Sequence, residues 1–190
     1  MSALETLREG IGEPFRDIKL NLQAVLSSAG VLTPAQRWGV AVASAAASRN
    51  VALRDAVIQA ARQEVSETVI EDALAAAALM AMNNVFYRFR HLVGKGSYAE
   101  KPARLRMNRI GRPATNKPDF ELFSLAVSAI NGCGTCMQAH EQAVVGSSMT
   151  EDHVHDAVRI ASVIVSGAVA LELAGIPPAA ARAPDLPVSA

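Results

Sequence analysis

Residues 120–141, which read FELFSLAVSAINGCGTCMQAHE, decide how the rest of the chain is organised. The segment opens with an apolar run that is interrupted at Asn131-Gly132, and it contains both cysteines of the chain, Cys133 and Cys136. An apolar run that stops at Asn-Gly is typical of a helix that ends and turns. The sequence therefore predicts two consecutive helices, with a dithiol at the N-terminus of the second.

The positions of four side chains within this segment indicate thiol chemistry. A free cysteine forms its nucleophilic thiolate at about pH 8.5, and the positive end of a helix dipole stabilises the thiolate. Cys133 and Cys136 lie one turn apart, close enough for a disulfide if their rotamers allow, and His140 follows one turn later. If the helices fold back at Gly132, the carboxylate of Glu121 comes near the imidazole. We therefore expect a proton relay of carboxylate, imidazole and thiol.

The composition favours closely packed helices. Hydrophobic residues make up 51% of the 190 residues while aromatic residues make up 4%, and alanine is abundant. Eighteen basic and eighteen acidic residues give a net charge of zero, so we expect neither nucleic acid nor an anionic membrane as a partner. The N-terminus is amphipathic and acidic, and no uninterrupted apolar run reaches about 18 residues, which predicts a cytoplasmic protein. A C-x-x-C pair in that reducing compartment favours redox cycling or metal binding over a structural staple.

The order of the helix signals predicts one all-α domain over residues 1–190. Thr33-Pro34 combines an N-cap with proline at the first helical position. Residues 94–118 contain many glycines and prolines and predict a long irregular connection, with a short extended piece at 105–110. The proline-rich tail, residues 175–190, is expected to be disordered or loosely packed. The predicted helices cover two stretches within 3–29, then 34–48, 51–63, 68–90, and the two helices of the central segment.

The two parts of the chain resemble each other. A shift of about 84 residues places Ser44-Ala45 on Ser128-Ala129 and Asp72-Ala73 on Asp156-Ala157. We interpret residues 34–90 and 118–174 as two related helical halves. In this alignment Arg49 lies opposite Cys133, so the first half has the same helices but lacks the reactive side chains of the second.

Metal binding is an alternative interpretation of the same residues. Cys133, Cys136 and His140 supply three ligands and Glu121 a conceivable fourth, as a zinc or iron site requires. A second loose cluster, which comprises Glu151, Asp152, His153 and His155, fits a solvated helix start better than a metal site, and we expect no bound metal or cofactor.

The motif Glu121, Cys133-Gly134-Thr135-Cys136 and His140 resembles the signature of the AhpD alkylhydroperoxidases, whose fold is similar to that of the wider carboxymuconolactone decarboxylase superfamily. Flanking segments extend the resemblance from about residue 16 to residue 167; they are residues 16–22, 38–50, 80–88 and 105–108. A non-redox enzyme of that superfamily is a further alternative, although a decarboxylase has no evident use for paired cysteines.

The resemblance implies an antioxidant alkyl hydroperoxide reductase with a thiol, sulfenic acid and disulfide cycle. By position, Cys136 is the peroxide-attacking thiol and Cys133 the resolving partner, while Glu121 and His140 relay the proton. It also implies an all-helical homotrimer, reduction by the lipoyl group of a dehydrogenase-complex subunit, and electron transfer to the peroxiredoxin AhpC. Since Cys133 lies nearer the helix tip, we expect it to be the sulfur more open to partners.

One position departs from the pattern. Close members often carry histidine just before the second cysteine, where this chain has Thr135. A threonine hydroxyl donates a hydrogen bond but holds no positive charge, so we expect weaker stabilisation of the thiolate and a lower direct peroxidase rate.

Overall fold

The computed structural model describes residues 2–27 and 30–175, and within these ranges the chain is helical and has no β-strand. The prediction of an all-α fold is therefore confirmed. In chain order the elements are α1 (Ala3–Glu9), the 3₁₀ helix η1 (Glu13–Phe15), α2 (Arg16–Leu26), α3 (Pro34–Ser48), α4 (Val51–Ala61), α5 (Glu67–Val93), α6 (Gly96–Ala99), α7 (Asn108–Gly111), α8 (Lys117–Ile130), α9 (Gly134–Val145) and α10 (Glu151–Leu173).

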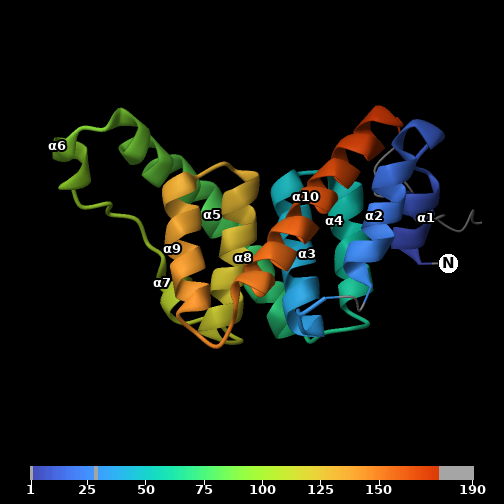
Figure 1. Cartoon of the computed structure of the whole chain (residues 1–190), viewed down its shortest axis with the longest axis horizontal. Coiled ribbons are helices and arrows are strands. Elements are labelled where there is room, and N and C mark those ends of the chain that lie inside the picture. The colour runs from blue at the N-terminus through green and yellow to red at the C-terminus, as the bar shows by residue number, and fades with distance from the viewer. Residues whose placement is uncertain (1, 28–29, 176–190) are drawn as a thin grey trace, which may run out of the picture.

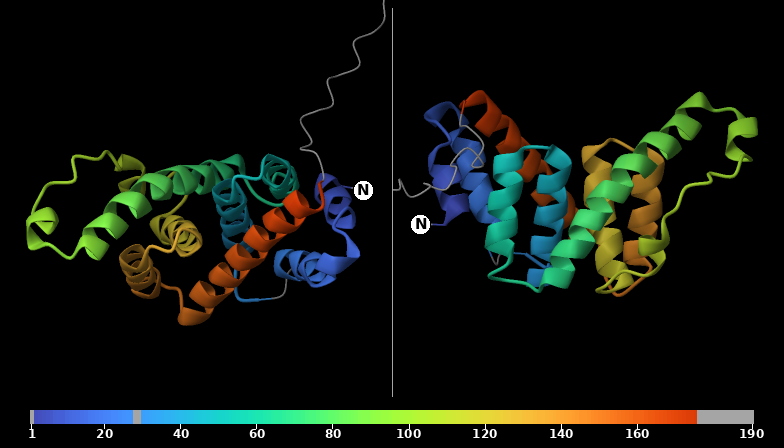
Figure 2. Two further views of the ribbon diagram at one scale, coloured as in Figure 1. Left: turned by 90° about the horizontal axis from the view of Figure 1, so that it is seen from above. Right: turned by 180° about the vertical axis from the view of Figure 1, so that it is seen from behind.

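Two helices, α3 and α8, form the centre of the body, and the long helices α5 and α10 lie on opposite sides of this pair (Figures 1 and 2). Close approach of α3 to α8 depends on Gly39, because a Cβ atom there would lie 2.1 Å from Cζ of the buried Phe123. Most residues of both central helices are apolar, and most are buried. The first helix of each predicted half therefore supplies the middle of the core.

A matched pair of aspartates joins the two predicted halves. Asp72 on α5 accepts the backbone N–H of Thr115, just before α8, at 2.7 Å. Asp156 on α10 accepts the backbone N–H of Val31, just before α3, at 3.0 Å. The third helix of each half thus anchors the segment that leads into the first helix of the other half. These reciprocal contacts support the interpretation of the chain as two related helical halves, and that interpretation stays a prediction.

The connection between α5 and α8 differs from the expectation. The extended piece predicted at 105–110 is wrong, because Asn108–Gly111 forms one turn of helix, α7. Arg109 of this turn donates to the buried carboxylate of Asp72 at 2.8 Å, which holds the turn against α5. The end of α5, the short helix α6 and the stretch that follows project from the body as an arm (Figure 1).

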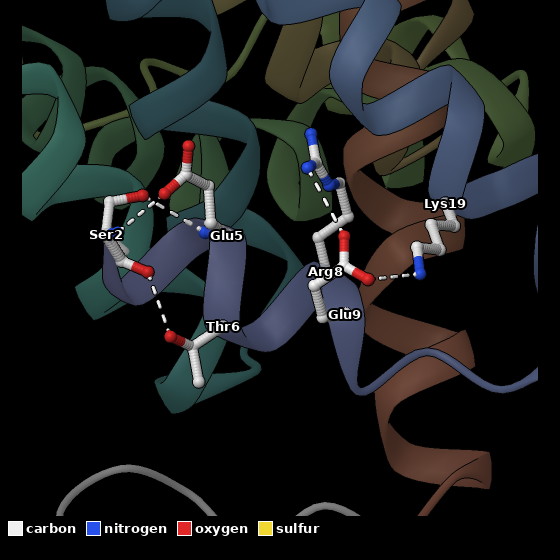
Figure 3. Close-up of polar contacts among 6 residues, drawn as sticks. All are labelled: Ser2, Glu5, Thr6, Arg8, Glu9 and Lys19. Carbon is white, nitrogen blue, oxygen red and sulfur yellow. Dashed lines mark hydrogen bonds and ion pairs between the residues drawn. The ribbon is translucent and has the colours of Figure 1, made fainter.

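The N-terminal helix is fixed at both of its ends by polar contacts (Figure 3). The Ser2 side chain caps α1 by accepting from the Glu5 N–H, while the Glu5 carboxylate accepts from the Ser2 N–H. At the other end, Lys19 of α2 pairs with Glu9 at 2.7 Å. The predicted break between two N-terminal helices is present at Gly10–Phe15.

Two helices of the described part, α5 and α10, are long and apolar enough to cross a membrane by length and composition. Half of each apolar window is buried in the body, as in the core helices of many globular proteins, so this is weak evidence for a membrane protein. The predicted tail lies outside the described residues except for Gly175.

Candidate functional site

The turn between α8 and α9 determines where the cysteines lie. Gly132 adopts a left-handed conformation, with φ of +67°, and its N–H donates to the carbonyl of Ala129 at 3.1 Å. The N–H of Cys133 donates to the carbonyl of Ser128, also at 3.1 Å. These two bonds form a Schellman motif, which satisfies the last carbonyls of α8. Cys133 therefore ends the motif of one helix and is at the same time the N-cap of the next.

Cys133 and Cys136 are joined by a disulfide, with their Cα atoms 5.3 Å apart. Cys133 is fully buried, whereas Cys136 keeps 7% of its surface exposed. The expectation that Cys133 is the more open sulfur is therefore wrong, because the end of α8 and helix α9 enclose the N-cap position while Cys136 lies within the first turn of α9. Any partner that attacks this disulfide directly meets Cys136 first.

The predicted pairing of Glu121 with His140 is present. Nδ1 of His140 lies 2.6 Å from Oε2 of Glu121, and both side chains are largely buried, with 12% and 9% exposed. An ionised carboxylate only accepts hydrogen bonds, so Nδ1–H donates and Nε2 is left to accept a proton. Fold-back at Gly132 has brought the two helices together as the sequence predicts.

The second nitrogen of His140 does not contact a cysteine in this disulfide form. Nε2 lies 3.2 Å from Sδ of Met80 on α5, and no hydrogen bond joins the imidazole to either cysteine sulfur among the described residues. Met80 is fully buried. The carboxylate–imidazole part of the expected relay is assembled, and the imidazole–thiol part is not made in the disulfide state.

Helix α5 supplies a wall of the site that sequence analysis did not assign. Met80, Asn84 and Arg88 lie one turn apart along α5 and contact α8 or α9. In the sequence, residues 80–88 are notable only for their resemblance to the AhpD family. The available signal was a polar pair, Asn83-Asn84, within the otherwise apolar stretch 73–87 of this helix.

Of the other singled-out residues, His153 lies away from the dithiol, whereas Thr135 lies between the two cysteines. Thr135 is exposed on the first turn of α9. His153 lies beside Thr150 at the start of α10, where its Nδ1 accepts the Thr150 N–H at 3.2 Å. Within residues 2–27 and 30–175, no group of three or more His, Cys, Asp or Glu side chains could hold a metal ion. The residues of the disulfide site thus do not form a ready metal site in this state.

Several hollows mark the surface on the side of the first half, and two of them are compared with the site. One, of about 450 Å³, lies among α1, α2, α3 and α4 beside Trp38 and contains no residue of the dithiol site. The other, of about 290 Å³, is lined mainly by alanines of α3 and α5 together with Arg49 and Arg54, and it reaches Asn131. Only this second groove approaches the turn that precedes Cys133.

Comparison with known proteins agrees with the site. Residues 97–177 match the carboxymuconolactone decarboxylase family. The alkyl hydroperoxide reductase AhpD of Anaeromyxobacter dehalogenans (strain 2CP-C) is 67% identical over 186 residues, which cover 96% of this chain and 100% of the relative. The protein of the same name from Brucella canis is 47% identical over 172 residues, which cover 90% of this chain and 98% of the relative. These similarities extend over nearly the whole of both chains and include the dithiol segment, so the chain belongs to the AhpD family of alkyl hydroperoxide reductases.

Proposed function

We propose that the protein reduces organic hydroperoxides with the Cys133–Cys136 dithiol. The observation that carries this proposal is the buried disulfide at the start of α9, adjacent to a buried Glu121–His140 pair. Paired cysteines at a helix N-terminus, next to a group that accepts protons, are what a thiol-based reductase needs.

The proposed cycle begins at Cys136. Its thiolate attacks one oxygen of the hydroperoxide, the O–O bond breaks, and the leaving alkoxide takes a proton to become an alcohol. Cys136 is then a sulfenic acid. The Cys133 thiol displaces its hydroxyl as water and forms the disulfide. Two thiols are oxidised and one peroxide is reduced, so atoms and electrons balance.

His140 and Glu121 are assigned to the first proton transfer. Glu121 holds the tautomer in which Nε2 is free to take the Cys136 proton, directly or through water. Because Nε2 lies against Met80 in the disulfide form, we infer that the imidazole turns toward Cys136 once the cysteines are reduced.

For the return of electrons we propose the dihydrolipoyl group of a dehydrogenase-complex subunit. One of its thiolates attacks Cys136, the cysteine that retains exposed surface, and releases Cys133. The second thiolate of the lipoyl group then frees Cys136. The same dithiol would in turn reduce the peroxiredoxin AhpC. The name of these relatives, alkyl hydroperoxide reductase, supports a role with organic hydroperoxides in general terms.

We further propose a cytoplasmic homotrimer. The arm at the end of α5 supports self-association, because it exposes large apolar side chains that no other part of the described chain covers. The most exposed of them are Val85 at 62%, Phe89 at 47% and Leu92 at 74%.

The first test is a count of free thiols. The reduced protein receives one equivalent of an alkyl hydroperoxide, and mass spectrometry locates the change. The proposal expects both thiols to disappear, with a loss of two hydrogens confined to Cys133 and Cys136. Thiols that stay unreacted would contradict it, and the metal content of the protein would then decide the metal-site alternative. Cys136→Ser should abolish peroxide turnover.

A further inference from the structure

We propose that Asn84, assisted by Arg88, is a positioning residue that sets how readily Cys133 and Cys136 form their disulfide. The inference rests on the proposed function only in taking the dithiol to be redox-active. It concerns the contacts that α5, far from the cysteines in sequence, makes with the end of α8, the helix that leads into Cys133.

Asn84 is 1% exposed, and both ends of its amide contact the last turn of α8. Its Nδ2 donates to Oγ of Ser128 at 2.9 Å. Its Oδ1 accepts from Nδ2 of Asn131, also at 2.9 Å. One buried side chain therefore holds two residues of the turn that leads into Cys133.

Arg88 adds a third contact one turn further along α5. Its guanidinium donates to the carbonyl oxygen of Asn131. That carbonyl belongs to the C-cap of α8, where the helix leaves its own acceptors unsatisfied. The side chain and the backbone of Asn131 are thus both held from α5.

The link from this turn to the sulfur is short. The carbonyl of Ser128 accepts the N–H of Cys133, so the backbone of Cys133 is bonded to a residue that Asn84 holds. Cys136 belongs to helix α9 and does not share these bonds. Fixing the turn therefore fixes one thiol relative to the other, which raises their effective concentration toward each other.

The test measures the equilibrium between the protein and dithiothreitol, without peroxide or lipoyl group. The protein disulfide takes two electrons and two protons from the reagent, which yields two protein thiols and the cyclic disulfide of dithiothreitol. Asn84→Leu removes two hydrogen bonds from the turn and should shift this equilibrium about tenfold toward the protein dithiol. Arg88→Met should shift it about threefold in the same direction.

Asn83→Leu is the matched control. Asn83 is 5% exposed on the same helix, and its Oδ1 has no hydrogen-bond partner in the part of the chain that the structure describes. This variant should leave the equilibrium within twofold of the unchanged protein. An equal shift in Asn83→Leu, or no shift in Asn84→Leu, would overturn the proposal.

Circular dichroism first establishes that each variant folds. If Asn84→Leu does not fold, Arg88→Met decides the question, since its side chain is only partly buried. A threefold shift then supports the proposal, and an unchanged equilibrium overturns it. Because no hydroperoxide takes part, a failure of the peroxidase assignment leaves this measurement unaffected, and the two failures are distinguishable.

Discussion

Replacing Asp72 by asparagine should destabilise the protein more than any surface charge change. The Asp72 side chain is fully buried and accepts hydrogen bonds from the backbone of Ala114 at 3.1 Å and from the backbone and hydroxyl of Thr115, both at 2.7 Å. Arg109 pairs with the same carboxylate, at 2.7 Å. Asp72→Asn removes the charge and one acceptor oxygen, so the partly exposed Arg109 guanidinium and a backbone N–H group lose their bonds.

Removing one partner of a fully buried ion pair costs about 3–5 kcal/mol. Because 37% of the Arg109 side chain is exposed and one amide oxygen remains at position 72, we expect the cost of Asp72→Asn at the lower end, about 3 kcal/mol. For a chain of this size, 1 kcal/mol lowers Tm by about 2–4 °C, so we expect a drop of about 6–12 °C. Thermal unfolding followed by circular dichroism at pH 7 measures it.

Two further aspartates calibrate the measurement. Asp55 pairs with Arg54 at 2.7 Å on the surface, with 47% of its side chain exposed. Asp55→Asn should therefore cost less than about 1 kcal/mol. Asp156 is 13% exposed and pairs with Arg159 at 3.0 Å, so Asp156→Asn should fall between the other two. A drop for Asp72→Asn no larger than that for Asp55→Asn would refute the reasoning.

The stabilisation by Asp72 should also depend on pH. Burial acts to raise the pKa of Asp72, but the hydrogen bonds from Thr115, Ala114 and Arg109 outweigh it, and the pKa lies below its ordinary value of 3.8. Because the folded pKa is lowered, the stabilisation is present in full above about pH 4 and is lost as pH falls through the folded pKa. Denaturation at pH 7 and pH 3 should show the difference between Asp72→Asn and the unchanged protein shrinking at the lower pH. An undiminished difference would contradict the assignment.

Three other predictions concern the site and the arm. Met80→Leu keeps the core volume but removes the sulfur that contacts the His140 imidazole, so the rate of reaction with peroxide should rise about two- to fivefold. Met82→Leu is the control, and a lower rate in Met80→Leu would contradict the inferred turn of the imidazole. Thr135→His should speed thiolate attack about two- to tenfold at pH 6 in stopped-flow assays, and an unchanged rate would show that a cation there is not needed. Leu92→Glu should convert the proposed trimer into monomers, as measured by light scattering at about micromolar concentration, while Leu20→Glu, also at an exposed leucine, should not. An unchanged mass in the first variant would show that the arm is not part of the interface.

Much of the fold follows from local signals in the sequence. Thr33-Pro34 predicts the start of α3, and the structure has the capping box there that this pair suggests. Asn131-Gly132 predicts the turn before the cysteines, because only glycine adopts a φ of +67° without strain. The proximity of Glu121 and His140 follows from the same turn. Each of these inferences depends on residues close together in the chain, or on a single fold-back.

What the sequence does not predict depends on packing between distant segments. Asn84 is far from the cysteines in sequence, and nothing in its own helix shows that its amide contacts the end of α8. The burial of Cys133 follows from the neighbours that enclose it and not from its place at the helix tip. The helical turn at Asn108–Gly111 is held by Arg109 against Asp72, a contact between parts of the chain that local propensity does not describe.

In both predicted halves, the N-cap residue of the second helix is bonded to the third residue of that helix, but the two bonds are of different kinds. The bounds of the helices place the N-cap of α4, Asn50, opposite the N-cap of α9, Cys133, one residue from the predicted alignment with Arg49. Asn50 accepts the backbone N–H of Leu53, three residues later, at 2.8 Å. Cys133 instead bonds covalently to Cys136, again three residues later.

An N-cap joined to the third residue of its helix therefore occurs in both halves, as a hydrogen bond in one and as a disulfide in the other. The Asn50 side chain satisfies one of the first N–H groups of α4, whereas Cys133 makes no side-chain hydrogen bond to the first N–H groups of α9. The disulfide that joins Cys133 to Cys136 opens on reduction. The first N–H groups of α9 are then free to stabilise a thiolate on Cys136. On this reasoning, the absence of an ordinary cap at α9 is part of what makes its cysteines reactive.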